Sequence, residues 1–298
     1  MSYLALLNYL DKNKIEYRFD GCLADLVSMR VGGIADLVVY PASTIELVEI
    51  VRLLKNCRYF LLGNGTNCYF TSKRYHGAVI VTKKIKNAYC RENLIYAECG
   101  VNLTSLCYLA LSNSLCGLEF ANGIPASVGG AVFMNASAFG GMISNLLIKS
   151  VAYDIDNDKI VTLNRQKHIF SKKFSVFRLG KYIHLSSEFL LEKGSQELIL
   201  EKMQSYLLNR QSKQPLNLPN SGSVFVNPDC GIASKMIDEC GLKGLSVGGA
   251  QVSTKHAGFI VNLGNATSDD VNNLIDTIKK RVYEKYKINL KQEIIYTE

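Results

Sequence analysis

Residues 117–141 read GLEFANGIPASVGGAVFMNASAFGG, and the interpretation of the whole chain depends on this stretch. It contains no Lys or Arg, and Glu119 is its single acidic residue. Glycine and alanine let another body approach the backbone closely, and glycine freely adopts positive φ. The run is too irregular for a plain helix and too rich in glycine for a plain strand. Two interpretations stay open on composition: a backbone wall against a large flat ligand, or a tightly packed buried turn.

Length and composition predict a soluble protein. The 298 residues indicate one large domain or two to three small ones, and an apolar content of 48% suffices for a core. No run of eighteen apolar residues occurs, so we expect no membrane insertion. The nine cysteines include no CxxC pair and follow no secretory signal, which predicts reduced thiols, a cytoplasmic protein and no metal site.

The net charge of +8 favours an anionic partner, such as a phosphorylated small molecule or a nucleic acid. The cations are scattered in pairs along the chain and are not gathered into a tail. A nucleic-acid partner therefore remains only a weak alternative.

Upstream of residue 117 the pattern alternates strands and helices. We predict strands at 26–33, 35–40 and 59–62, and a helix capped by Ser43 with Glu46. The strand at 59–62 runs directly into GNGTN at 63–67, where bare backbone N–H groups could converge on a phosphate. This turn is neither a P-loop nor a GxGxxG fingerprint, so a simple tight turn is the favoured interpretation of this motif taken alone.

From residue 102 onward the pattern is also mixed. We predict a helix capped by Asn102, a hairpin over 150–163, a strand at 182–191 and a helix at 196–209. Beyond these we predict a helix at 232–240, a strand at 258–263, a helix from Ser268 with a Thr267–Asp270 capping box, and a strand at 293–297. Between the helices, prolines at 215, 219 and 228 stiffen a long loop. Rigidly supported loops are where binding and catalysis tend to occur.

Several motifs agree in order and spacing with one family. They are SMRVGG at 28–33, LGNGTN at 62–67, the stretch 117–140, GSVFVNP at 222–228 and HAGFIVN at 256–262. The chain resembles the UDP-N-acetylenolpyruvoylglucosamine reductase family, in its shorter subtype, over essentially its whole length. The resemblance implies an α+β fold with two FAD-binding α/β subdomains, of the vanillyl-alcohol-oxidase type, and a C-terminal α+β substrate domain. We place the subdomains at 1–83 and 84–194 and the substrate domain at 195–298.

The resemblance also implies the cofactors and a two-step reaction. NADPH would reduce FAD, and the flavin would then pass hydride to the enolpyruvyl double bond of the UDP-sugar substrate. GNGTN at 63–67 would cradle the FAD pyrophosphate, and the small-residue stretch would line the flavin ring. The residues so implied at the cofactor are Arg30, Gly63, Asn64, Gly65, Thr66, Asn67, Gly123, Ile124, Pro125, Ala126, Ser127, Gly129, Gly130, Asn135 and Ala136.

Three catalytic residues follow from the same resemblance. Ser223 would protonate the substrate carbon, Glu293 would help polarise the substrate carboxyl, and Lys173 stands where the family usually has an arginine. Lysine supplies charge without arginine's bidentate fork. Val226 and Met142 are further departures, from a usual Lys and a usual Glu. Candidates for the uridine diphosphate end are Arg210, Lys213, Asn227 and His256.

Alternatives remain beside this hypothesis. One keeps the fold and makes the protein another FAD-linked oxidoreductase, and another makes it a flavin-binding protein with weak or lost reductase activity. A basic nucleic-acid binder is disfavoured because no clustered basic and aromatic surface is evident. We expect a monomer that acts on a small molecule.

Overall fold

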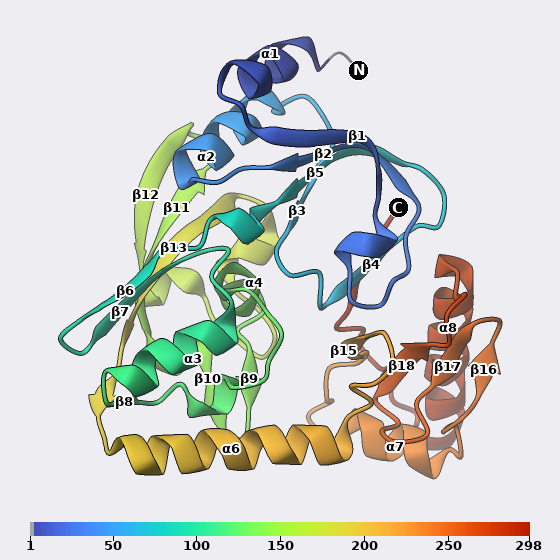
Figure 1. Ribbon diagram of the computed structural model, residues 1–298. Coiled ribbons are helices and arrows are strands. Elements are labelled where there is room, and N and C mark those ends of the chain that lie inside the picture. The colour runs from blue at the N-terminus through green and yellow to red at the C-terminus, as the bar shows by residue number, and fades with distance from the viewer. Residues whose placement is uncertain (1–2) are drawn as a thin grey trace. The chain divides into compact units, whose positions relative to one another are not determined.

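A computed structural model describes residues 3–298, which divide into two compact units (Figure 1). Unit 1 comprises residues 3–18, 37–64 and 77–209, and unit 2 comprises residues 19–36, 65–76 and 210–298. The chain passes from one unit to the other within three strands, in the GNGTN turn and in a long helix. No helix of the described chain is both long and apolar enough to cross a membrane.

Unit 1 contains a five-stranded sheet in the order β12-β11-β13-β7-β6 (Figure 1). Its strands are β6 (Ala88–Arg91), β7 (Leu94–Glu98), β11 (Leu147–Asp154), β12 (Lys159–Asn164) and β13 (Tyr182–Leu190), and neighbouring strands are antiparallel. Helices α3 (Leu103–Ser112), α4 (Val128–Phe133) and α5 (Ile143–Leu146) belong to the same unit. Apolar side chains of α3 and α4, among them Leu103, Leu106 and Val132, are fully buried in one core with Ile95 and Phe189 of the sheet.

A second sheet has the order β1-β2-β5-β3. Its strands are β1 (Glu16–Cys22), β2 (Ile34–Tyr40), β3 (Tyr59–Leu62) and β5 (Tyr75–Val81). Helices α1 (Leu4–Lys12) and α2 (Thr44–Leu53) contribute Leu6, Leu10 and Leu47 to its core. Because β3 runs parallel to β5, both of these strands end toward the same edge, and the GNGTN turn leaves β3 there.

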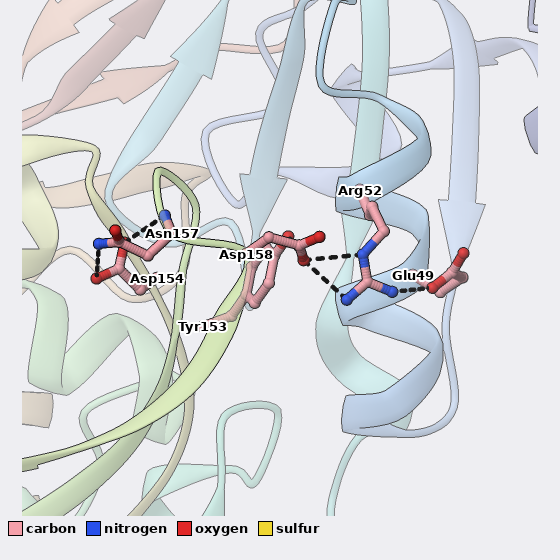
Figure 2. A network of polar contacts seen from close by, with 6 residues as sticks. All are labelled: Glu49, Arg52, Tyr153, Asp154, Asn157 and Asp158. Atoms are coloured by element: carbon pink, nitrogen blue, oxygen red, sulfur yellow. Dashed lines mark hydrogen bonds and ion pairs between the residues drawn. The ribbon is translucent and has the colours of Figure 1, made fainter.

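The β11–β12 hairpin is held to α2 by a polar network at its tip, which Figure 2 shows. Arg52 of α2 donates from Nε to Asp158 Oδ1 (2.9 Å) and also pairs with Glu49. Tyr153 donates its hydroxyl proton to the same Asp158 oxygen (2.8 Å), while Asp154 accepts from the backbone of Asn157 (3.1 Å). The side chains of Arg52 and Asp158 are substantially exposed, so the network orients the hairpin and adds only modest stability.

Unit 2 contains a four-stranded sheet in the order β15-β18-β17-β16. The strands are β15 (Asn220–Ser223), β16 (Ser246–Val247), β17 (Ala250–Val252) and β18 (Phe259–Asn262), and α7 (Ala233–Glu239) and α8 (Ser268–Tyr286) belong to the same unit. The buried face of α8 presents Val271, Leu274, Ile275, Ile278 and Val282 to a core shared with α7. Strand β4 (Cys68–Phe70) pairs in parallel with the C-terminal strand β19 (Ile295–Thr297).

Further elements belong to none of these sheets. They are the pairs β8 (Leu115–Cys116) with β14 (Glu192–Lys193) and β9 (Ser137–Ala138) with β10 (Gly141–Met142), and the helix α6 (Gln196–Lys213), whose C-terminal residues enter unit 2. The nine cysteines are all free thiols, and in residues 3–298 no group of three His, Cys, Asp or Glu side chains could hold a metal ion.

The local signals for helix starts are confirmed. Ser43 accepts from Glu46 N (3.2 Å), Asn102 accepts from Thr104 N (2.9 Å), and Thr267 forms a complete capping box.

The strand predicted over 26–33 is wrong, because the 3-10 helix Ala24–Leu26 ends at the first residue of this segment and a turn with irregular chain follows. Arg30 N bonds to Val27 O (3.1 Å), and Arg30 has a φ of 54°. The side chains of Val27, Met29 and Val31 are buried as in a strand. The backbone nevertheless joins no sheet: Ser28 N bonds to Gly65 O, and Met29 O accepts from the Asn262 side chain.

Candidate active site

The first half of the GNGTN turn lies against the small-residue stretch within unit 1. A Cβ built on Gly63 would overlap the Ser127 hydroxyl, which itself accepts from Gly130 N (3.2 Å) as the N-cap of α4. Asn64 donates from Nδ2 to Pro125 O (3.0 Å). The structure therefore brings together two segments, 63–64 and 125–130, that sequence analysis assigned to the same cofactor. Only glycine at 63 permits this approach.

Residues 123–130, with Asn135 and Ala136, form the predicted flavin wall, and most of them keep accessible surface. Gly129 N donates to Cys99 O (2.8 Å), and a Cβ on Gly129 would lie 3.0 Å from that oxygen. Gly123 has a φ of 77° and donates its N–H to Thr104 Oγ1 (3.3 Å). Partly or fully exposed positions of the wall are Gly123, Ile124, Pro125, Ala126, Gly129, Gly130 and Ala136. A neutral backbone surface of this kind suits a flat aromatic ligand.

Asn135 differs from these neighbours because it is buried, with 4% of its surface exposed. Its Oδ1 accepts from Ser144 N (3.0 Å) and its Nδ2 donates to Ser171 O (3.0 Å). The side chain thus fixes the wall to two other segments of unit 1.

The second half of the GNGTN turn belongs to unit 2. Gly65 has a φ of 68°, and a Cβ there would overlap Leu26 O. Ser28 donates its backbone N–H to Gly65 O (2.9 Å) and its hydroxyl proton to Asn220 O (2.8 Å). Asn67 exchanges bonds with the C-terminal segment, donating to Glu293 O (3.3 Å) and accepting from Ile295 N (2.9 Å). Thr66, between these two, is half-buried.

The SMRVGG segment meets the HAGFIVN segment in the same unit. Asn262 donates from Nδ2 to Met29 O (3.0 Å) and is buried. The exposed Arg30 side chain projects from the left-handed turn that this bond helps to hold.

A cavity of about 220 Å³ in unit 2 brings three predicted residues together. Its lining is Ser223, Phe225, Asn227, Ile232, Ala233, Ser234, His256 and Gly258. Ser223 is the last residue of β15, paired with Phe259 of β18, and is exposed. Sequence reasoning missed Ser234, because nothing in the local pattern distinguishes it from other helix serines.

The polar groups of this cavity are fixed by local bonds. His256 Nδ1 accepts from Gly258 N (3.1 Å), which leaves the proton of the neutral ring on Nε2. Burial lowers the pKa of His256, so the ring is neutral at physiological pH. Asn227 Oδ1 accepts from Ala233 N (3.0 Å) and joins its loop to the start of α7.

Glu293 lies close to Ser223 along the backbone. Glu293 N donates to Val224 O (2.8 Å), and the neighbouring residues Phe225 and Gln292 form an isolated bridge. The Glu293 residue is 9% exposed. Arg210 is buried in the last turns of α6 and Lys213 is exposed at its end, and neither lines the cavity.

Lys173 is described within unit 1, in a tight loop. Ser171 and Phe174 exchange backbone hydrogen bonds (3.2 Å each), and Lys173 between them has a φ of 58°. Ser175, which is fully buried, donates to Phe133 O (2.9 Å) at the end of α4.

Comparison with known proteins identifies the two parts of the chain. Residues 35–162 match the family model of an FAD binding domain, and residues 214–297 match that of the UDP-N-acetylenolpyruvoylglucosamine reductase C-terminal domain. A UDP-N-acetylenolpyruvoylglucosamine reductase of Caldicellulosiruptor bescii is 41% identical over 96% of this chain and 92% of its own length. One of Clostridium novyi is 38% identical over 97% of this chain and 94% of its own. The crystal structure of the reductase (MurB) from Thermus caldophilus superposes with a TM-score of 0.80 at 29% identity, over 95% of this chain and 99% of that one. The α+β chain studied belongs to the UDP-N-acetylenolpyruvoylglucosamine reductase family.

Proposed function

We propose that this protein reduces UDP-N-acetylglucosamine enolpyruvate to UDP-N-acetylmuramate, with FAD as bound cofactor and NADPH as co-substrate, in peptidoglycan precursor synthesis. The single observation that carries the proposal is the unit 2 cavity, because it gathers Ser223, Asn227 and His256 in a chain that matches both domains of the reductase family.

The residues present fit FAD. The contact between Gly63 and Ser127 leaves no room for a Cβ, and the wall beside it carries no charged side chain from residue 123 to 136. Backbone N–H groups of 63–67 would hold the diphosphate, and residues 123–130 with Ala136 would lie along the ring. When bound, the flavin takes hydride from NADPH and delivers it to the enolpyruvyl double bond.

Ser223 would supply the proton that the reduced substrate carbon needs. Its hydroxyl lines the cavity at the end of a paired strand, so its position is fixed by the sheet. An unperturbed serine hydroxyl is a weak acid, so nearby charges must lower the barrier for this transfer. We assign that electrostatic role to Glu293 and Lys173. Glu293 would help polarise the substrate carboxyl group, and the positive charge of Lys173 would neutralise it.

The nucleotide end of the substrate would contact the remaining polar residues. His256 offers a neutral Nε2–H donor, and Asn227 lines the same cavity. Arg210 and Lys213 would supply charge to the diphosphate. A volume of about 220 Å³ is below the roughly 300–1,000 Å³ of typical ligand pockets, so the cavity takes part of the nucleotide sugar.

The proposal also includes a cytoplasmic monomer. In support, its cysteines are free thiols and its anionic substrates suit a net charge of +8. The three-part division at residues 83 and 194 is a further proposal, to be tested by limited proteolysis of the FAD-loaded protein.

The deciding experiment follows NADPH oxidation by the purified yellow protein with and without UDP-N-acetylglucosamine enolpyruvate. We expect oxidation that depends on the sugar substrate and yields UDP-N-acetylmuramate. A yellow protein that oxidises no NADPH with this substrate would be a flavin-binding protein without reductase activity. A protein that transfers electrons only to a different acceptor would be another FAD-linked oxidoreductase.

A further inference from the structure

The loop over residues 171–174 places a lysine where turn geometry favours glycine. The backbone bonds between Ser171 and Phe174 close a four-residue turn, and Lys173 occupies its third position with a φ of 58°. Residues with a Cβ are strained in this left-handed region, and such turns usually carry glycine or asparagine there. The Lys173 conformation therefore needs support from its surroundings.

Arg178 supplies a direct contact to that strained residue. Its Nη1 donates to the Lys173 carbonyl oxygen at 2.7 Å, a short hydrogen bond from a charged group. The same guanidinium lies over the ring of Phe133, 5.8 Å from its centroid, and Arg178 is half-buried. A planar guanidinium can stack on a ring and donate in its own plane, and its rigid fork fixes the direction of that bond more firmly than a flexible lysine ammonium does.

The end of α4 anchors this arrangement. Phe133 offers its ring to Arg178 and its carbonyl oxygen to Ser175, and Asn135 donates to Ser171 O. Phe133 and Asn135 belong to the small-residue stretch that forms the flavin wall. The Lys173 backbone is thus tied, through Arg178, to the segment on which the cofactor would rest.

We propose that Arg178 is a positioning residue, which fixes the backbone of Lys173 relative to the flavin wall and so directs the Lys173 ammonium. The inference rests on the proposed function, because directing the Lys173 ammonium matters only if that ammonium acts on the substrate. It concerns a residue that acts through another, and Arg178 itself need not touch the substrate.

The test compares Arg178→Gln and Arg178→Lys with Lys181→Gln in the FAD-loaded protein. Lys181 is exposed and lies over the Tyr182 ring. Its substitution by glutamine removes the same positive charge three positions after Arg178. We expect Arg178→Gln and Arg178→Lys to lower kcat at least about tenfold with little change in KM or FAD content. Lys181→Gln should stay close to the unsubstituted protein.

A double-mutant cycle with Lys173→Ala separates positioning from general damage. If Arg178 acts through Lys173, then Arg178→Gln has no further effect once the lysine is gone. An equal loss in both backgrounds would overturn the proposal, as would equal activities of Arg178→Gln and Lys181→Gln.

Hydrogen exchange gives a readout that does not depend on turnover. Amides over residues 171–174 should exchange faster in Arg178→Gln than in Lys181→Gln, and unchanged exchange would overturn the proposal even in an inactive protein. The proposed function fails separately, if the unsubstituted protein lacks reductase activity. If Lys173→Ala retains all of that activity, the proposed function stands and the role given to Lys173 and Arg178 is overturned.

Discussion

Acidification should destabilise unit 1 through a buried histidine in β13. His184 is buried and bonds through Nε2 to Ser187 Oγ (2.7 Å), which bonds in turn to Ser150 Oγ (2.7 Å). Ser150 Oγ also contacts His168 Nε2 (2.9 Å). In the described part of the chain, His184 Nδ1 has no hydrogen-bond partner that could share an added proton. Burial, with a smaller contribution from His168, lowers the pKa of His184 to about 3.

The magnitude follows from the difference between the folded and unfolded pKa values. In the unfolded chain the imidazole has a pKa of about 6.5, so below that pH the unfolded state binds a proton that the folded state does not. Stability from neutral His184 is therefore complete above about pH 6.5 and is lost as the pH falls toward 3. Between pH 7.5 and pH 5.0 the loss in free energy of unfolding is about 2 kcal/mol. The pKa of His168 is also lowered, mainly by burial, and adds a loss of the same sign.

The assay is urea unfolding followed by circular dichroism at both pH values, for the unsubstituted protein and His184→Gln. Glutamine can still bond to Ser187 but does not titrate, so the pH-dependent loss should shrink by about 2 kcal/mol. His76→Gln is the control, because the His76 side chain is 76% exposed. The reasoning is refuted if His184→Gln and the unsubstituted protein lose equal stability between the two pH values.

Three further predictions concern the candidate site. Gly63→Ala should weaken FAD binding about fivefold or more, since its Cβ displaces the Ser127 hydroxyl and a lost N-cap costs ~1 kcal/mol. Equilibrium dialysis measures the affinity, and Ser127→Ala shows how much of the loss comes from the N-cap alone. An unchanged affinity of Gly63→Ala contradicts this prediction. Lys173→Arg should raise kcat in steady-state assays because a guanidinium binds a carboxylate in bidentate fashion, and Lys173→Ala should lower kcat. If the arginine variant is no faster, or the alanine variant loses no activity, the assignment of Lys173 to the active site is wrong. Ser223→Ala should lower kcat roughly 10²- to 10⁴-fold while NADPH still reduces the flavin at the original rate; equal slowing of both half-reactions would instead indicate a structural role.

Local chemistry explains which elements could be predicted from the sequence. The caps at Ser43, Asn102 and Thr267 depend on residues three or fewer positions away, and the structure has all three. The helix predicted to end at 209 continues to Lys213, because helix ends depend on the segment that follows.

Long-range contacts explain what the sequence did not reveal. The 26–33 segment alternates like a strand, but Ser28 bonds to Gly65 and Asn220, which only the folded chain brings near. The role of Gly63 came from the family resemblance, because Ser127, which it contacts, lies 64 positions away in the sequence. The pair Lys172 and Lys173 gives no sign in the sequence that the backbone of Lys173 is strained.

We propose that electrons from NADPH reach the enolpyruvyl group through the bound flavin, and an anaerobic two-step experiment tests this transfer. The protein is first bleached with a stoichiometric amount of NADPH, and UDP-N-acetylglucosamine enolpyruvate is then added without oxygen. We predict that the yellow absorbance returns in proportion to the substrate added, with an equal amount of UDP-N-acetylmuramate formed. A flavin that stays bleached until oxygen is admitted would show that the reduced flavin does not pass its electrons to this substrate.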